Sequence, residues 1–197
     1  MIFQNKMSPT RWNRKRLAIT SISILILYVL FFSNGYHHYQ IDSLIPESRP
    51  EDVWEYVADF RKMRSLNPTI LDFKITSDEG NRDHWKYSVE YHEHLSHWPY
   101  WKSTAFADYS VIKHLPGQSE SYLIQSNHKT CFFGGLYCLR SESDFKFSPL
   151  GKDTYCAERV SYQCPPFLGS ACRRELEFQR KAVMNNLTMF FSKSRKN

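Results

Sequence analysis

Residues 48–70 indicate two consecutive short helices in a chain that otherwise has mainly the pattern of strands. Ser48 and Glu51 have the spacing of a capping box, which starts a helix. Apolar side chains then recur at helical spacing, and the pair Asn67-Pro68 stops the second helix. The segment therefore predicts an amphipathic helix followed by a shorter one, and both need a sheet or another helix to cover their apolar side.

Alternating apolar and polar residues predict seven strands around this helical pair. The pattern is clearest over 85–92, where Trp85, Tyr87, Val89 and Tyr91 alternate with polar residues. Strands are expected over 39–45, 71–76, 85–92, 101–114, 120–133, 136–147 and 153–163. Apolar residues at helical spacing then predict a long amphipathic helix over 168–191.

The positive charge of the chain is concentrated near its N-terminus. Five basic residues precede Asp42, the first acidic one, and without them the formal charge falls from +6 to +1. A nucleic-acid-binding domain carries its excess of basic residues itself, so no nucleic-acid partner is expected. The basic residues are Lys6, Arg11, Arg14, Lys15 and Arg16.

An uncharged run over 17–32 follows this basic segment and extends to about Tyr36. Twenty helical residues span about 30 Å, the thickness of a hydrocarbon core. Residues 17–36 are therefore expected to form a transmembrane signal-anchor helix, which makes a membrane an expected partner. The positive-inside rule places the basic tail, 1–16, in the cytoplasm. These features predict a single-pass protein of the secretory pathway, in the endoplasmic reticulum or plasma membrane.

Two alternatives to an uncleaved anchor remain open. A cleavable signal peptide needs a shorter apolar region and a cleavage site of small residues, for which 33–35 is a poor match. The Arg-rich leader without acidic residues also fits a mitochondrial presequence, which would place the protein in the mitochondrial inner membrane.

Five cysteines lie in the C-terminal half, without CxxC pairs or zinc-site spacing. In an oxidising compartment they are expected to form disulfides. A turn at 134–135 would place Cys131 opposite Cys138, whereas the next turn would place Cys138 nearly opposite Cys164. Only one of these pairs can form, and buried free thiols in a reducing compartment are the alternative. Asn186 begins an acceptor sequon and is a candidate for glycosylation.

The order of elements and one local pattern resemble the START-like superfamily, also called SRPBCC or helix-grip. The pattern is PEDVW at 50–54 followed by LNP at 66–68. The superfamily includes lipid-transfer START domains, pathogenesis-related allergens, polyketide cyclases and coenzyme-Q-binding proteins. The resemblance covers 39–191 and implies an α+β fold, in which a curved seven-stranded antiparallel sheet grips the last helix. The two short helices close one end of a cavity, and a basic tail, 192–197, follows.

One long helix cannot by itself fill the concave side of a curved sheet, so large side chains or a ligand must fill the rest. We therefore expect membrane-tethered binding, transfer or presentation of a hydrophobic small molecule such as a lipid, sterol or isoprenoid. Candidates for the cavity lining are Phe73, Ile75, Trp85, Tyr87, Tyr91, Leu176 and Val183. Candidates for its rim are Trp98, Tyr100 and Trp101, which otherwise pack as a loop over the end of the sheet.

Two other functions remain open. The first is a cyclase or hydratase in which Tyr87 or Tyr91 serves as an acid or hydrogen-bond donor, and the second is a disulfide-braced interaction domain with a filled core. No nucleophile elbow, phosphate loop or H-E-x-x-H motif identifies a catalytic residue, and no cofactor is expected. Glu90, His92 and His94 share one face of a strand, but this is the wet face, so no metal site is expected. Convergent polar groups in the cavity would favour the enzyme.

Overall fold

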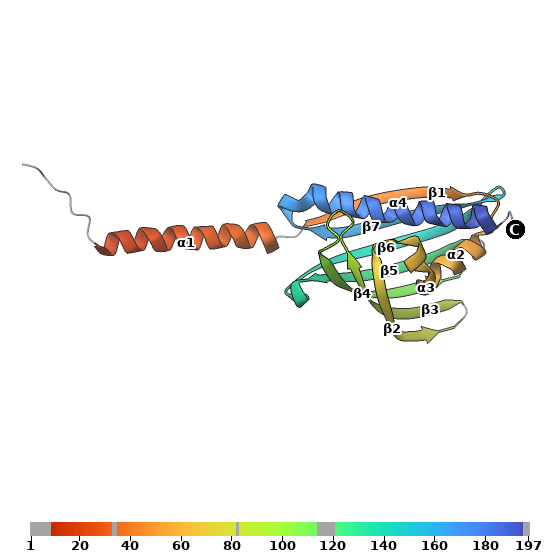
Figure 1. Ribbon diagram of the computed structural model, residues 1–197, viewed down its shortest axis with the longest axis horizontal. Helices are drawn as coiled ribbons and strands as arrows, with labels where there is room; N and C mark the ends of the chain where they lie inside the picture. The colour runs from red at the N-terminus through yellow and green to blue at the C-terminus, as the bar shows by residue number, and fades with distance from the viewer. Residues whose placement is uncertain (1–8, 33–34, 82, 114–120, 195–197) are drawn as a thin grey trace, which may run out of the picture.

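The computed structural model describes residues 9–32, 35–81, 83–113 and 121–194. The elements are α1 (Pro9–Phe32), β1 (Gly35–Ile45), α2 (Pro50–Ala58), α3 (Phe60–Leu66), β2 (Ile70–Gly80), β3 (His84–His94), β4 (Lys102–Ile112), β5 (Tyr122–Phe132), β6 (Tyr137–Leu150), β7 (Asp153–Cys164) and α4 (Gly169–Ser194). Short 3-10 turns, η1 (Phe133–Gly135) and η2 (Pro166–Leu168), precede β6 and α4. This order agrees with the predicted strand, two helices, six strands and long helix (Figure 1).

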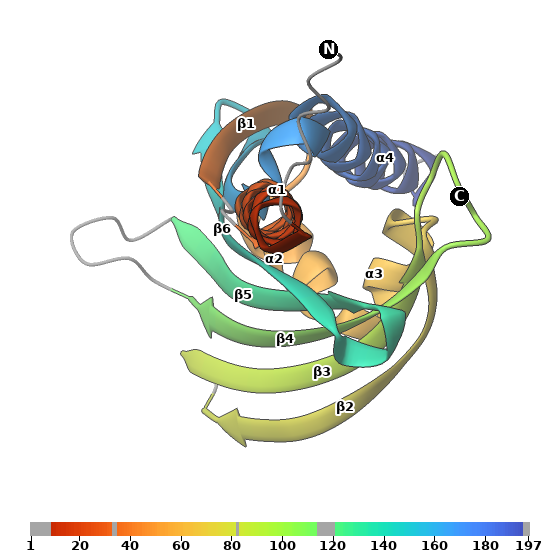
Figure 2. The ribbon, with the colours of Figure 1, turned by 90° about the vertical axis from the view of Figure 1, so that its left-hand side faces the viewer.

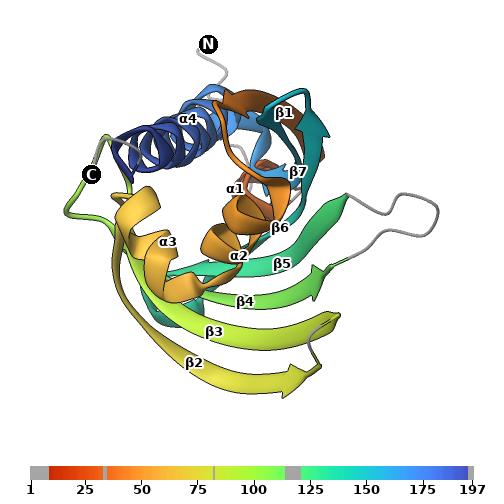
Figure 3. The same ribbon diagram turned by 90° about the vertical axis from the view of Figure 1, so that its right-hand side faces the viewer.

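The seven strands form one antiparallel sheet in the order β1-β7-β6-β5-β4-β3-β2. The first two strands of the chain are thus the two edges of the sheet, and α2 and α3 connect them. The sheet curves around these helices, while α4 contacts β1 and α3 contacts both β2 and α4 (Figures 2 and 3). The helices α3 and α4 therefore close the open side of the curved sheet.

The core lies between the concave face of the sheet and the helices. The ring of Phe60 on α3 lies 5.2 Å from Phe73, 5.3 Å from Tyr91 and 5.8 Å from Tyr109, between ring centroids. This one side chain therefore links α3 to three neighbouring strands. Residues that are fully buried include Ile45, Val53, Leu66, Phe147 and Leu187.

The predicted transmembrane helix over 17–36 is wrong. Among the described residues, no helix has the length and apolarity needed to cross a membrane. The helix α1 spans Pro9–Phe32, so its first turns carry basic residues, and β1 begins at Gly35. Its uncharged part, 17–32, spans only about 24 Å. The prediction of a single-pass membrane protein, in the secretory pathway or the mitochondrial inner membrane, depends on that helix and is therefore wrong as well.

The predicted capping box is also wrong. Arg49 is the N-cap of α2, and no side chain caps that helix. Ser48 Oγ instead donates a hydrogen bond to Thr154 Oγ1 on β7 at 3.0 Å, and Glu51 forms an ion pair with Lys113 Nζ at 2.7 Å. Both side chains thus hold the start of α2 against the ends of other elements rather than capping the helix.

Two disulfides brace the domain. Cys131 pairs with Cys138 across the turn between β5 and β6, which is one of the two predicted pairings. Gly134 in this turn has a positive φ of 68°. Cys164 pairs with Cys172, which joins the end of β7 to the first turn of α4, so the alternative Cys138–Cys164 pair is wrong. Cys156 is free and buried. The strand-based prediction considered only facing strands and therefore missed the partner on the helix.

Asn186 connects α4 to α3, because its Nδ2 donates a hydrogen bond to the carbonyl of Leu66 at 2.8 Å. Asn186→Ala is expected to lower the free energy of unfolding by about 1–3 kcal/mol, since the buried carbonyl loses its donor. Urea unfolding of protein made without N-glycans measures this loss. Asn185→Ala is the matched control, because Asn185 is exposed, and equal losses in both variants would contradict the prediction. Glycosylation of Asn186 itself stays a prediction.

Candidate functional site

A small cavity of about 40 Å³ lies between the concave face of the sheet and helices α2, α3 and α4. Its volume accommodates about one or two water molecules. Apolar side chains from the helices and the sheet form part of its wall: Val57, Phe60, Met63, Ile70, Ile124, Phe145 and Val183. Polar side chains form the remainder: Asn67, Tyr91, Tyr109, Ser126, His128, Ser143, Glu158, Gln179 and Arg180.

A buried ion pair between β7 and α4 is the most polar part of this wall. Arg180 Nη1 donates a hydrogen bond to Glu158 Oε1 at 2.9 Å, and Ser143 Oγ donates to the same oxygen at 2.7 Å. The side chain of Glu158 is only 2% exposed and that of Arg180 20%. Within the described residues, Glu158 Oε2 and Arg180 Nε are buried and have no hydrogen-bond partner. The pair therefore keeps one acceptor and one donor unused beside the cavity.

A chain of three hydrogen-bonding side chains lies on β3 and β5. The Tyr91 hydroxyl is 3.0 Å from His128 Nδ1, and His128 Nε2 is 2.9 Å from Ser126 Oγ. Burial, together with the charge of Arg180, lowers the pKa of His128 to about 3. The imidazole is therefore neutral at physiological pH, with one nitrogen as donor and the other as acceptor.

A second buried carboxyl, Glu93, lies on the same face of β3 as Tyr91. Gln179 Nε2 is 3.5 Å from Glu93 Oε2 and donates a hydrogen bond to Glu175 Oε1 at 3.2 Å. Burial raises the pKa of Glu93 to about 7, although the charge of Arg180 opposes the shift. The backbone N–H of Ser96 donates to both oxygens of Glu175 at 3.0 Å. This network connects α4 to the loop between β3 and β4.

The predicted cavity residues occupy different parts of the core. Tyr91 and Val183 line the cavity. Tyr87 is buried and donates a hydrogen bond to the carbonyl of Ala58 at 2.8 Å. Phe73, Ile75 and Trp85 pack at the margin of the core, and Leu176 packs in a separate cluster with Val160, Tyr162 and Cys164. The structure thus brings two of the seven to the cavity, and the ligand role of all seven stays a prediction.

The predicted rim residues lie away from the cavity. Trp98, Tyr100 and Trp101 are 57%, 95% and 52% exposed, and none of them lines it. The indole of Trp101 lies 5.6 Å from the ring of Phe133 in the turn between β5 and β6, between centroids. The three residues therefore form part of an exposed aromatic surface over the end of the sheet, and a role as cavity rim stays a prediction.

The histidines of β3 lie where the sequence places them, on the face opposite Tyr91. His92 is exposed, and its Nδ1 lies 2.6 Å from Asp72 Oδ1 on β2. Glu90 and His94, on the same face, are partly buried. In the part of the chain that the structure describes, no group of three His, Cys, Asp or Glu side chains has an arrangement that could hold a metal ion.

Apart from Tyr91, the residues that make the cavity polar are absent from the sequence-based candidates. Glu158, Arg180 and His128 are the most important of them, because together they carry the buried charges and the neutral imidazole. A signal for Glu158 exists in the alternation of β7, where it occupies an inward position between Cys156 and Val160. A charged residue on the apolar face of a strand is rarely left unpaired, so such a position points to a partner or a ligand.

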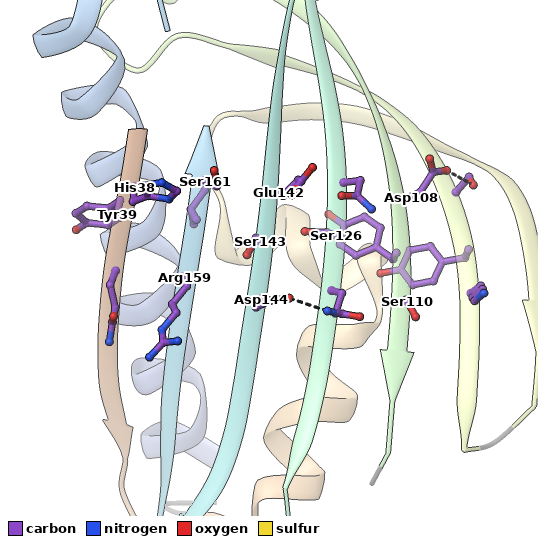
Figure 4. Close-up of a pocket in the computed structure, with 18 of the residues that line it drawn as sticks. His38, Tyr39, Asp108, Ser110, Ser126, Glu142, Ser143, Asp144, Arg159 and Ser161 are labelled. Carbon is purple, nitrogen blue, oxygen red and sulfur yellow. Dashed lines mark hydrogen bonds between the residues drawn. The ribbon is translucent and has the colours of Figure 1, made fainter. Parts of the chain in front are cut away.

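A larger hollow, of about 1030 Å³, crosses the outer face of the sheet (Figure 4). It is an open groove with polar side chains from every strand, and several of them pair with one another. Ser88 Oγ donates a hydrogen bond to Asp108 Oδ1 at 2.6 Å, and Gln125 Nε2 donates to Asp144 Oδ1 at 2.8 Å. Of the three buried side-chain atoms without a hydrogen-bond partner among the described residues, Trp54 Nε1 lies on α2, and the other two, Glu158 Oε2 and Arg180 Nε, belong to the wall of the inner cavity. This makes the inner cavity the stronger candidate site.

No family model and no curated protein sequence matches the chain. Solved structures do match its fold. The protein TTHA0849 from Thermus thermophilus matches with a TM-score of 0.58 at 12% identity, over 80% of this chain and 99% of that one. The di-domain ARO/CYC StfQ from the steffimycin biosynthetic pathway matches with 0.57 at 13% identity, over 82% of this chain and 53% of StfQ. The human StarD13 (DLC2) lipid transfer and protein localization domain matches with 0.53 at 12% identity, over 78% and 76%.

At identities of 12% and 13%, these matches report on architecture and not on shared site residues. Each match nonetheless covers 78–82% of this chain, which is most of its length. The resemblance that the sequence indicated is therefore confirmed at the level of the fold. Residues 35–194 of this chain form a domain with the START-like helix-grip fold.

Proposed function

We propose that the domain binds a small molecule with an apolar body and a polar end in the cavity beneath α4. The observation that carries this proposal is the buried Glu158–Arg180 pair, in which Glu158 Oε2 and Arg180 Nε have no partner. A buried ion pair gives little stability compared with a well-packed apolar core. Each unpaired buried polar atom costs a further 1–3 kcal/mol, roughly. A ligand that bonds both atoms accounts for their presence.

The apolar body of the ligand would lie against Phe60, Ile124, Phe145 and Val183, which line the same cavity. Burial of apolar surface there gives affinity at about 25 cal/mol per Å². The space of about 40 Å³ is far smaller than the roughly 300 Å³ of a typical ligand pocket. Binding therefore requires side chains to move. Met63 on α3 is partly exposed and lines the cavity, and its flexible side chain suits a gate between α3 and α4.

An enzyme of cyclase type is a second candidate, because polar groups converge on the cavity. A neutral imidazole that is hydrogen-bonded to a phenol, as in His128 and Tyr91, can take up and return a proton. One of the structural neighbours, StfQ, is named as an ARO/CYC protein of a biosynthetic pathway. Turnover of a bound ligand would separate this candidate from simple binding.

Native mass spectrometry of the purified full-length chain, titrated with decyl and sterol compounds that carry one polar group, tests the proposal. We expect a one-to-one complex and a higher melting temperature. Met63→Trp should weaken binding at least tenfold by filling the gate, whereas Arg64→Trp, at an exposed neighbouring position, should not. If no compound binds, or if both variants bind like the parent, the proposal is refuted.

A further inference from the structure

We infer that the polar end of the ligand is uncharged and presents both a hydrogen-bond donor and an acceptor, as a primary amide or a hydroxyl group does. This inference rests on the proposed function of the cavity and adds the chemistry of the group that it recognises. Its basis is the pair of unused atoms. Glu158 Oε2 is a carboxylate oxygen and can only accept, whereas Arg180 Nε carries a hydrogen and can only donate.

The charges around the cavity give a second, independent argument. The charge of Arg180 is offset by Glu158 at 2.9 Å, so no free positive charge remains for an anion. Two more carboxyl groups, Glu93 on β3 and Glu175 on α4, lie near the same helix face, since Gln179 contacts both. The facing residue of β5, His128, is neutral. An anionic end would therefore meet carboxylates, and a cationic end would meet Arg180.

Apart from Tyr109, the other polar side chains of the wall already have hydrogen-bond partners. His128 bonds Tyr91 and Ser126, and Ser143 donates to Glu158. The two unused atoms of the ion pair, Glu158 Oε2 and Arg180 Nε, are therefore the main candidates for recognising the polar end of the ligand.

A series of compounds with the same decyl chain tests this inference on the full-length protein by calorimetric titration. We expect decanamide and decanol to bind at least tenfold more tightly than methyl decanoate, which has only acceptors, and than decanoate or decylamine. If decanoate, decylamine or methyl decanoate binds as tightly as decanamide, the inference is overturned while the proposed function stands. If no member of the series or of the sterol panel binds, the proposed function itself fails.

Glu158→Gln provides a change of specificity as a second test. Removal of the carboxylate leaves Arg180 as an unpaired positive charge, so decanoate should bind at least tenfold more tightly than it binds the parent. Glu142→Gln is the matched control, because Glu142 is exposed on the outer face of β6. An equal gain in both variants, or no gain in a folded Glu158→Gln protein, would overturn the inference. If Glu158→Gln does not fold, the decyl series on the parent protein decides alone.

Discussion

Arg180→Met is expected to lower the free energy of unfolding by about 3–5 kcal/mol, the largest effect that we predict for a single substitution. The reason is that the substitution leaves the buried carboxylate of Glu158 without its ion-pair partner. Glu158 is 2% exposed, and without the guanidinium its carboxylate keeps only the hydrogen bond from Ser143. Equilibrium unfolding in urea at pH 7 measures the loss as a lower midpoint at an unchanged slope.

The double variant Glu158→Gln, Arg180→Met is the control for this interpretation. Because both charges are then gone, the double variant should recover most of the lost stability. Arg159→Met controls for the loss of an arginine from the surface, since Arg159 is exposed on the outer face of β7. Two single variants whose losses simply add in the double variant would show that the ion pair has no energetic role.

Glu93→Gln is expected to stabilise the protein in a pH-dependent way. Burial raises the pKa of Glu93 from 4.5 to about 7 in the folded state. Below pH 4.5 the carboxyl is mostly protonated in both the folded and the unfolded chain, so burial of a charged carboxylate does not lower the free energy of unfolding there. As the pH rises from 4.5 to 7, the unfolded chain loses this proton more readily than the folded one, so stability falls. The difference between variant and parent should reach about 3 kcal/mol above pH 7.

Thermal or urea unfolding at several pH values between 4 and 8 tests this dependence. The readout is the difference between Glu93→Gln and the parent, because all other titrating groups then cancel. Glu90→Gln, on the opposite face of the same strand, controls for the loss of a carboxylate from β3. A difference that stays constant over the whole pH range would contradict the prediction.

The elements of the domain could be predicted because their patterns are local. Alternation in β3 and β7 and helical spacing in α4 depend only on which neighbours are apolar, and the observed bounds lie close to the expected ones. The first helix shows the limit of such reasoning. Its bounds were inferred from an uncharged run, but the helix includes part of the basic segment, and Gly35 and Tyr36 belong to β1.

The site could not be predicted in the same way, because its properties arise from contacts between distant elements. Glu158 and Arg180 are separated by 22 residues, and only the packing of α4 across β7 makes them a buried pair. The roles of Ser48 and Cys172 depend likewise on partners in other elements. An acidic residue in the apolar register of a strand is the one signal that the sequence does contain, and it would have led to Glu158 first.

Two of the contacts that hold α4 have a consequence for rates. The Cys164–Cys172 disulfide holds its first turn to β7, and Asn186 holds its later part to Leu66 at the end of α3. These two contacts hold α4 to β7 and to α3, so for a ligand that enters by the proposed gate at Met63 they restrict how far α3 and α4 can separate. We expect association through such a restricted gate to be slower than entry into an open pocket, and dissociation to be slow for the same reason. For the proposed ligand we therefore expect long retention rather than rapid exchange.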